Sequence, residues 1–221
     1  MKFFSYIKYF FYIAINWNVK IAWHIIRREI KGEKKYGIAT TGADELKSLK
    51  KKGVEIEHAT IYMPVSYDLL EEIFKQINSS SYKHFLDIGC GKGRALCMAA
   101  HKGFNKVTGI DFSNVLCTAA TENLLLTKQK FPSLSYAVIN NDAFYFEIPL
   151  DVDCIFLFNP FDDTIMSGVV ENIRLSIEEY PRKMTILYAN PMHKELFIDE
   201  DFKEVFATKK MNYLEAVILQ N

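Results

Sequence analysis

The stretch 84–96, HFLDIGCGKGRAL, places three glycines at alternate positions directly after an apolar run. These glycines are Gly89, Gly91 and Gly93. The run before them is typical of a buried strand, and the residues after them have the pattern of a helix. One glycine is enough for a tight turn, whereas three leave bare backbone that a ligand can approach closely. The spacing therefore favours a binding loop at the carboxyl end of a strand, where open parallel sheets bind their ligands.

From about residue 60 onward, strand-like and helix-like segments alternate. Further strands are expected at KVTGID, LSYAVIN, DCIFLFN and KMTILYAN, and the tail FKEVFATKKMNYLEAVILQ is typical of two strands with a turn near 211–213. Such alternation predicts a parallel sheet with helices on both faces, and a terminal hairpin adds an antiparallel edge. We therefore expect an α/β fold of Rossmann-like type, with a mostly parallel seven-stranded sheet, an antiparallel C-terminal hairpin and a helical N-terminal extension.

Charge divides the chain into two parts. Residues 1–58 contain 12 Lys and Arg residues against 6 Asp and Glu residues, a net +6, and residues 59–221 carry the opposite excess. We predict a basic helical extension over 1–58, with a short helix over 43–52, and a single domain over 59–221. Because the total charge is balanced, the composition gives no strong nucleic-acid signal.

The sequence pattern of the extension predicts an amphipathic helix whose apolar side carries aromatic residues. Phe4, Ile7, Phe11 and Ile15 fall at helical spacing, and a basic cluster follows over 27–35. This pattern is typical of a helix lying on an anionic membrane, or of one that docks on the body or on a second copy, which is the commoner arrangement. The sequence contains no apolar run of about 18 residues, so it does not predict a membrane-spanning helix. We expect a cytoplasmic protein whose extension makes a peripheral membrane contact or self-associates.

The cysteines do not form the spacings of disulfide or zinc frameworks. Cys90, Cys97, Cys117 and Cys154 contain no CxxC pair. We expect buried thiols in a reducing compartment and no metal site.

The loop spacing narrows the class of ligand. The dinucleotide fingerprint is G-x-G-x-x-G, but Arg94 stands where its third glycine would be. The loop also lacks the G-x-x-x-x-G-K-[ST] pattern of phosphate-binding loops. Asp111 closes the next expected strand, and a carboxylate there can accept hydrogen bonds from both hydroxyls of a ribose. Its alternative role is helix capping, for which Ser113 is better placed. The expected ligand carries a ribose but is not a nicotinamide dinucleotide.

Four segments together resemble a known family. FLDIGCGKG, VTGIDFS, NNDAFYF and DCIFLFNPF occur in the order and spacing of the class I S-adenosylmethionine-dependent methyltransferases, and the resemblance extends over residues 60–221. It implies S-adenosylmethionine as the cofactor. It also implies the residues that hold it: Asp87 and the loop Gly89–Gly93 at the methionine end, Asp111 at the ribose, Phe112 beside the adenine, and Asp142 with Ala143 at the adenine amino group and ring.

The segment Asn159-Pro160-Phe161 follows the fourth expected strand, where this family places substrate-facing residues. It partly resembles the [DN]PP[YF] motif of amino-group methyltransferases, in which the Asn side chain and a backbone carbonyl hold the nitrogen and the ring packs on the substrate. One proline is missing here, so Phe161 comes one position early. The segment upstream resembles that of a bacterial branch of unassigned methyltransferases. Within it, Tyr62 and Pro64 match a Tyr-x-Pro element that is similar to one in membrane-associated protein-lysine methyltransferases. Tyr62 is either a site residue or a packing residue.

We therefore predict methyl transfer from S-adenosylmethionine to an amine-like nucleophile in a protein or a small molecule, with protein lysine as a candidate. The predicted catalytic residues are Asn159, Pro160, Phe161 and Tyr62. The alternatives are a small-molecule or RNA methyltransferase, a nucleotide-binding oxidoreductase, and a cofactor-binding module without catalysis. The missing third glycine disfavours the oxidoreductase, and the retained NPF segment argues against an inactive module.

Overall fold

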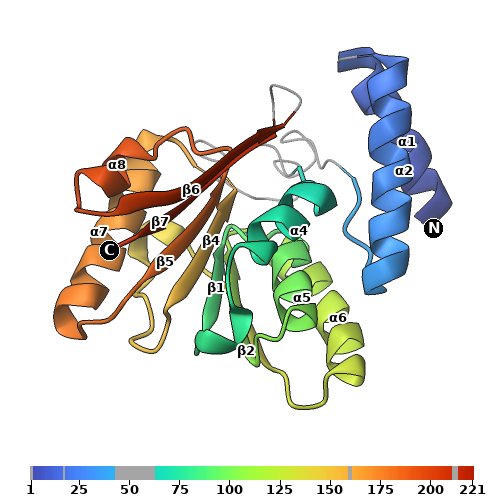
Figure 1. Ribbon diagram of the computed structural model, residues 1–221. Coiled ribbons are helices and arrows are strands. Elements are labelled where there is room, and N and C mark those ends of the chain that lie inside the picture. Colours follow the sequence, from blue (N-terminus) through green and yellow to red (C-terminus); the bar gives the residue numbers. More distant parts are fainter. Residues whose placement is uncertain (1, 17, 43–62, 159–160, 211–213) are drawn as a thin grey trace.

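The computed structural model describes residues 2–16, 18–42, 63–158, 161–210 and 214–221. A seven-stranded sheet forms its centre, with the strand order β3-β2-β1-β4-β5-β7-β6 (Figure 1). The strands are β1 Phe85–Ile88, β2 Lys106–Asp111, β3 Ser135–Asn140, β4 Cys154–Phe158, β5 Thr185–Ala189, β6 Lys203–Lys210 and β7 Leu214–Gln220. Strands β1 to β5 pair in parallel, and β7 pairs antiparallel with β5 and β6. The predicted fold is confirmed, while the expected turn over 211–213 lies outside the described residues.

Helices cover both faces of this sheet. The described helices are α1 Lys2–Asn16, α2 Val19–Tyr36, α4 Tyr67–Lys75, α5 Arg94–His101, α6 Asn114–Lys130, α7 Asp163–Glu179 and α8 Glu195–Ile198, with 3-10 turns η1 Ser79–Ser81 and η2 Ala143–Tyr145. Those that pack on the sheet include α4, α5, α6 and α7. Ser113 caps α6 by accepting a hydrogen bond from the Leu116 N–H, as its position in the sequence indicates. The sequence pattern did not predict α8 and η2, because elements this short have no readable period. The helix expected over 43–52 lies outside the described residues.

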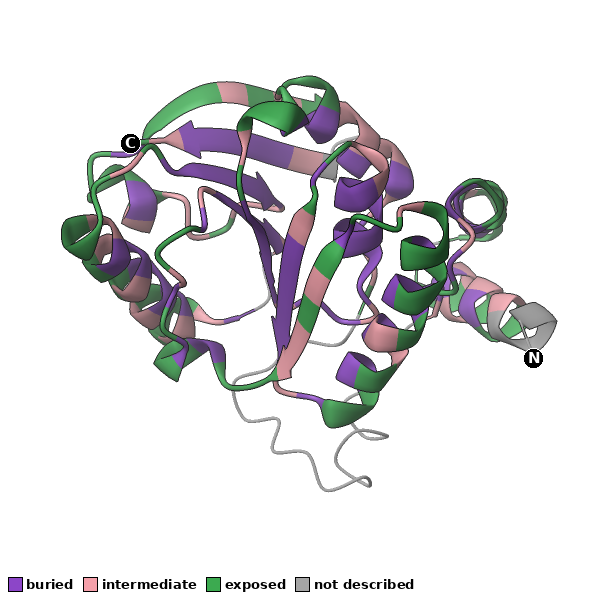
Figure 2. Ribbon diagram, turned by 90° about the horizontal axis from the view of Figure 1, so that it is seen from below, coloured by how far each residue is buried: buried purple, intermediate pink, exposed green. Residues whose placement is uncertain are grey.

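The sheet separates two apolar clusters. Residues of α4, α5 and α6 pack on one face and residues of α7 on the other, and the central strands are buried along their length (Figure 2). In β1, Phe85 belongs to the first cluster and Leu86 to the second. Because successive side chains of a strand point to opposite faces, Asp87 points to the same side as Phe85. This places a carboxyl group within the α5 face of the sheet.

Helices α1 and α2 form a hairpin beside the sheet domain (Figure 1). Tyr9 and Ile13 of α1 pack into one small cluster with Ala22 and Ile26 of α2. The stripe of Ile7, Phe11 and Ile15 points away from this cluster and is exposed. The helix therefore docks through the side of Tyr9 and Ile13, and the stripe singled out in the sequence is left uncovered by the described residues.

Two expectations concern features other than the sheet. All four cysteines are free and buried, which confirms the prediction that they are packing thiols. In the part of the chain that the structure describes, no helix has both the length and the apolar character needed to cross a membrane.

Candidate cofactor and methyl-transfer site

The glycine loop needs glycine at all three positions for its backbone. Gly89, Gly91 and Gly93 have φ angles of 80°, 53° and 77°, in the left-handed region where a Cβ is unfavourable. The amides of Gly89 and Cys90 both donate to the Ile110 carbonyl, at 2.9 Å each. The loop is thereby attached to the end of β2, and its tight path leads directly into α5.

Asp111 shapes this loop with its carboxylate. One oxygen accepts the Gly91 N–H and the other accepts the Ser113 N–H, both at 2.9 Å. Burial raises the pKa of Asp111, while these two hydrogen bonds lower it. A carboxylate has about four lone-pair positions, so each oxygen retains capacity for one hydroxyl donor. Asp111 thus holds the glycine turn through its two hydrogen bonds, and it can also offer acceptors for the predicted contact with the ribose.

Asp87 is a buried carboxyl group without a local partner. It is 3% exposed, and no donor in the described segments of the chain forms a hydrogen bond to it. Burial, together with the nearby charge of Asp111, raises the pKa of Asp87 well above its usual range. Two acidic groups in one apolar environment are unfavourable unless a cation or donor compensates them. The ammonium group at the methionine end of S-adenosylmethionine is such a cation, so the residues present fit this cofactor.

The remaining predicted cofactor residues lie at the ends of β2 and β3. Asp111 and Asn140 are register partners, and the Asn140 Nδ2 donates to the Asp111 carbonyl at 2.9 Å. Two residues further on, Asp142 is exposed and caps η2 through the Phe144 N–H. Ala143 is buried, and Phe112 is half-buried. The structure therefore gathers the predicted positions on three neighbouring strands, while their individual contacts with a cofactor stay predictions.

The comparisons with known proteins agree with this arrangement. Residues 85–179 match the family model described as a methyltransferase domain. These residues therefore carry a methyltransferase domain, and the protein is an S-adenosylmethionine-dependent methyltransferase. S-adenosylmethionine is accordingly its cofactor, as predicted. No curated protein sequence gives a significant match.

Solved structures show the same fold as this methyltransferase at low sequence identity. The StiE O-MT segment has a TM-score of 0.53 and 12% identity, covering 69% of this chain and 72% of that one. TehB from Haemophilus influenzae has a TM-score of 0.52 and 17% identity, covering 72% and 63%. An RNA methyltransferase from Salinibacter ruber in complex with S-adenosyl-L-homocysteine has a TM-score of 0.50 and 13% identity, covering 72% and 92%. These likenesses concern the fold alone.

The predicted acceptor-binding residues are described only in part. Asn159, Pro160 and Tyr62 lie outside the described residues. Phe161 is 8% exposed and belongs to the apolar cluster on the α7 face. Asp162, the next residue, caps α7 by accepting the Ile165 N–H at 3.0 Å. The Phe161 ring is therefore anchored in the core, and its predicted contact with the substrate is untested.

Arg94 has a structural role that the sequence pattern did not reveal. Its guanidinium is 3% exposed and donates to both carboxylate oxygens of Glu29 on α2, at 2.9 and 2.5 Å. It also donates to the Thr40 hydroxyl and to the Val65 carbonyl, and it lies 4.0 Å from the centre of the Tyr67 ring. The residue that replaces the third fingerprint glycine thus joins the N-terminal extension to the first turn of α5.

Residues 37–42 follow α2 and pack against the glycine loop. Glu33 accepts the N–H groups of Thr40 and Thr41, at 2.7 Å each. Asn123 accepts the Ala39 N–H and donates to the Lys92 carbonyl within the loop. The sequence carried one signal of this contact. Glu29 and Glu33 share the helix face of Ala22 and Ile26, and charged residues on an apolar face require buried partners.

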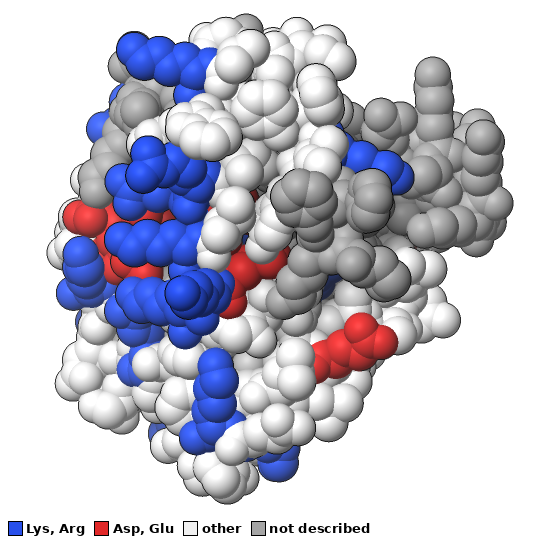
Figure 3. Space-filling view, turned by 90° about the vertical axis from the view of Figure 1, so that its right-hand side faces the viewer, with Lys and Arg blue, Asp and Glu red and all other residues white. Residues whose placement is uncertain are grey.

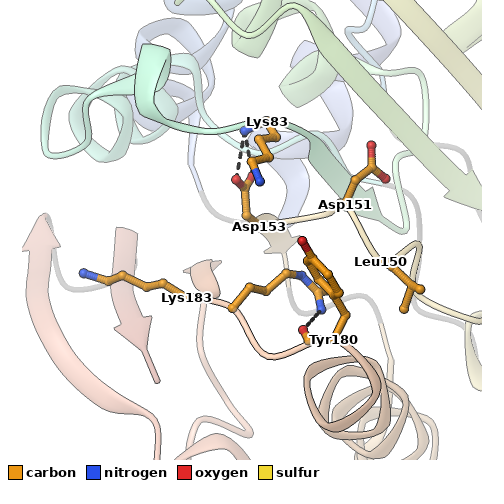
Figure 4. Close-up of a pocket in the computed structure, with 7 residues that line it drawn as sticks. Lys83, Leu150, Asp151, Asp153, Tyr180 and Lys183 are labelled. Carbon is orange, nitrogen blue, oxygen red and sulfur yellow. Dashed lines mark hydrogen bonds between the residues drawn. The ribbon is translucent and has the colours of Figure 1, made fainter.

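An open pocket of about 380 Å³ lies at the other end of the sheet. Its lining residues come from segments that precede β1, β4 and β5 (Figure 4). Within it, Asp153 accepts the backbone amides of Lys83 and His84, and Arg182 donates to the carbonyls of Val152 and Tyr180. These groups are occupied in joining strand ends. Since ligands of parallel sheets bind at the carboxyl ends of the strands, this pocket is not the methyl-transfer site.

S-adenosylhomocysteine is expected to stabilise the methyltransferase against heat, whereas NADH is not. At 100 times its dissociation constant, a ligand adds about 2.7 kcal/mol, which corresponds to a rise in Tm of about 5–10 °C for a chain of this size. Asp111→Ala is expected to reduce this rise, because the ribose loses its acceptor. Differential scanning fluorimetry measures the shift, with the ligand-free Tm of each variant as its baseline and Asp68→Ala, at an exposed ion pair, as the control. A rise with NADH alone would contradict the assignment.

Proposed function

We propose that the methyl acceptor is an amine nitrogen, with lysine in a protein as the candidate substrate, and that Asn159 and the Pro160 carbonyl hold it. The position of the segment after β4 carries this proposal. Strand β4 lies beside β1, with Leu157 level with Ile88, so the last residue of β4, Phe158, lies next to the point where the glycine loop begins. Sequence and topology together support an acceptor site at residues 159–160.

The proposed roles follow from what methyl transfer requires. The bound cofactor supplies the electrophilic methyl group, and the protein has to orient a nitrogen lone pair toward it and exclude water. An asparagine side chain offers one acceptor oxygen and two donor hydrogens, so it can fix the direction of an amine N–H. Phe161, the residue that follows this segment in the sequence, is buried in the core.

Asn159→Ala is expected to lower the single-turnover rate by roughly 100-fold or more, the scale of a misplaced reactant. Cofactor affinity is expected to change little, because the proposed contact is with the acceptor. Asn159→Asp is expected to retain more activity, since it keeps an acceptor and attracts a cationic amine. Single-turnover transfer of a radiolabelled methyl group tests this once a substrate is found. A near-normal rate in Asn159→Ala would overturn the proposed role and direct attention to Tyr62.

The substrate class can be tested before any substrate is known. The purified protein is incubated with radiolabelled S-adenosylmethionine and cell lysate, and the products are then treated with protease or nuclease. Label that becomes acid-soluble with protease, and that appears in methyl-lysine after hydrolysis, is the expected result. Label released only by nuclease would indicate an RNA substrate, and label in a small molecule that chromatography separates from S-adenosylmethionine would indicate a metabolite.

A further inference from the structure

The outer side of the α1–α2 hairpin exposes large apolar residues. On α1, Ile7, Phe11 and Ile15 are 36%, 57% and 81% exposed, and their spacing of four residues places them on one side of the helix. At the start of α2, Val19 and Trp23 are 64% and 61% exposed. The opposite side of α1 is already used, because Tyr9 and Ile13 pack against α2. Clustered exposed apolar residues of this kind mark a contact surface.

The outward side of α2 is basic. Lys20, Arg27, Lys31 and Lys34 are all exposed, and none of the four makes an ion pair with another described residue. Figure 3 shows Lys and Arg side chains in a column along this face, next to an uncharged area. The basic residues toward the body differ, since Arg28 pairs with Asp68. The four unpaired cations therefore need a partner outside the described chain, or water.

We propose that this hairpin lies on an anionic lipid surface. Ile7, Phe11 and Ile15 enter the boundary between headgroups and acyl chains, and the cations of α2 contact the lipid phosphates. Amphipathic helices with aromatic residues beside Lys and Arg bind such interfaces through apolar burial and electrostatic attraction together. Trp23 suits the headgroup level, where its ring meets both environments.

Charge complementarity favours lipid over a second copy of the chain. A two-fold contact brings the same patch of both copies together. The column of cations on one copy would then lie near the column on the other, and like charges in close contact oppose association. An anionic bilayer covers the apolar stripe and neutralises the cations at the same time. The body need not separate from the hairpin, because the contacts of Glu29 with Arg94 lie on the inward side of α2.

Vesicle co-sedimentation of the full chain tests the electrostatic half of the proposal. The protein is expected to bind vesicles of phosphatidylglycerol and phosphatidylcholine, and to bind phosphatidylcholine alone much more weakly. Each basic residue near such a surface contributes about a five-fold increase in affinity, so Lys31→Gln with Lys34→Gln is expected to lower the partition coefficient by about 25-fold. Lys75→Gln with Lys183→Gln, at exposed positions on the body, is the matched control. Equal binding to both vesicle types would overturn the proposal.

A second pair of variants tests the apolar half. Phe11→Ser is expected to lower vesicle binding by about 10-fold or more, since it removes an aromatic ring from the interface. Leu125→Ser, at a 51% exposed position on α6, is expected to have no effect. Because both residues are exposed, neither variant should impair folding, and circular dichroism verifies this. Light scattering supplies the competing outcome: a dimer that dissociates in Phe11→Ser, together with no vesicle binding by the wild type, would overturn the proposal in favour of self-association.

Discussion

Replacing Glu29 with leucine is expected to lower the free energy of unfolding by about 3–5 kcal/mol, because it leaves the Arg94 guanidinium buried without its carboxylate. Both side chains of the pair are almost fully buried, and the acceptors that Thr40 and Val65 offer to Arg94 are neutral. Urea denaturation measures the change from the shift in midpoint at constant slope.

Two further variants show whether the pair itself is responsible. Glu29→Leu combined with Arg94→Met is expected to cost much less than the sum of the single changes, since no charge remains buried. Arg28→Leu on the same helix removes an exposed ion pair with Asp68 and is expected to cost less than about 1 kcal/mol. If Glu29→Leu were as mild as Arg28→Leu, the assigned role of Arg94 in joining the extension to the loop would be wrong.

Asp87→Asn is expected to have opposite effects on cofactor binding and on stability. Losing one member of a buried charge pair costs about 2–5 kcal/mol, so the affinity for S-adenosylhomocysteine should fall by at least about 30-fold, as measured by isothermal titration calorimetry. The ligand-free protein should become more stable at neutral pH, because the change removes a buried carboxylate next to Asp111. Active sites commonly combine such local instability with function.

The pH dependence of this variant follows from the raised pKa of Asp87. A carboxyl group with a higher pKa in the folded state than in the unfolded state contributes most to stability at low pH, and that contribution is lost as the pH rises through the folded-state pKa. The stability difference between Asp87→Asn and the wild type should therefore grow with pH. Wild-type affinity for the ligand should rise over the same range, as the carboxylate forms. Parallel stability curves for the two proteins between about pH 5 and 8 would contradict this account.

Much of the fold and part of the site could be predicted from local sequence. The apolar run before Gly89 and the Ser113 cap report on their own immediate surroundings, and both agree with the structure. Asp111 was found because strand-ending carboxylates are recognisable in an α/β pattern. The two hydrogen bonds that its carboxylate accepts from backbone amides could not be predicted, since they depend on how the glycine loop folds over β2.

Contacts between distant segments explain the rest. The sequence shows Arg94 only as a departure from the dinucleotide-binding fingerprint. Its ion-pair partner Glu29 lies 65 residues away in the sequence, so the pair could not be predicted. Which side of α1 is exposed could not be predicted either, because the side that carries Tyr9 and the side that carries Phe11 are both apolar enough to pack against another helix. The choice between them depends on the shape of α2, where Ala22 and Ile26 receive Tyr9 and Ile13.

The pair between Glu29 and Arg94 also constrains how this chain can change over evolutionary time. A glycine at position 94 would remove the buried cation that pairs with Glu29, and loss of α2 would remove the carboxylate that pairs with Arg94. Because either change alone leaves a buried charge without its ion-pair partner and is therefore strongly destabilising, we expect the helix and Arg94 to be gained or lost together. The ion pair of Arg94 with Glu29 thereby couples the evolution of α2 to that of the first turn of α5, and we expect methyltransferases with Arg at this position to carry the N-terminal helix as well.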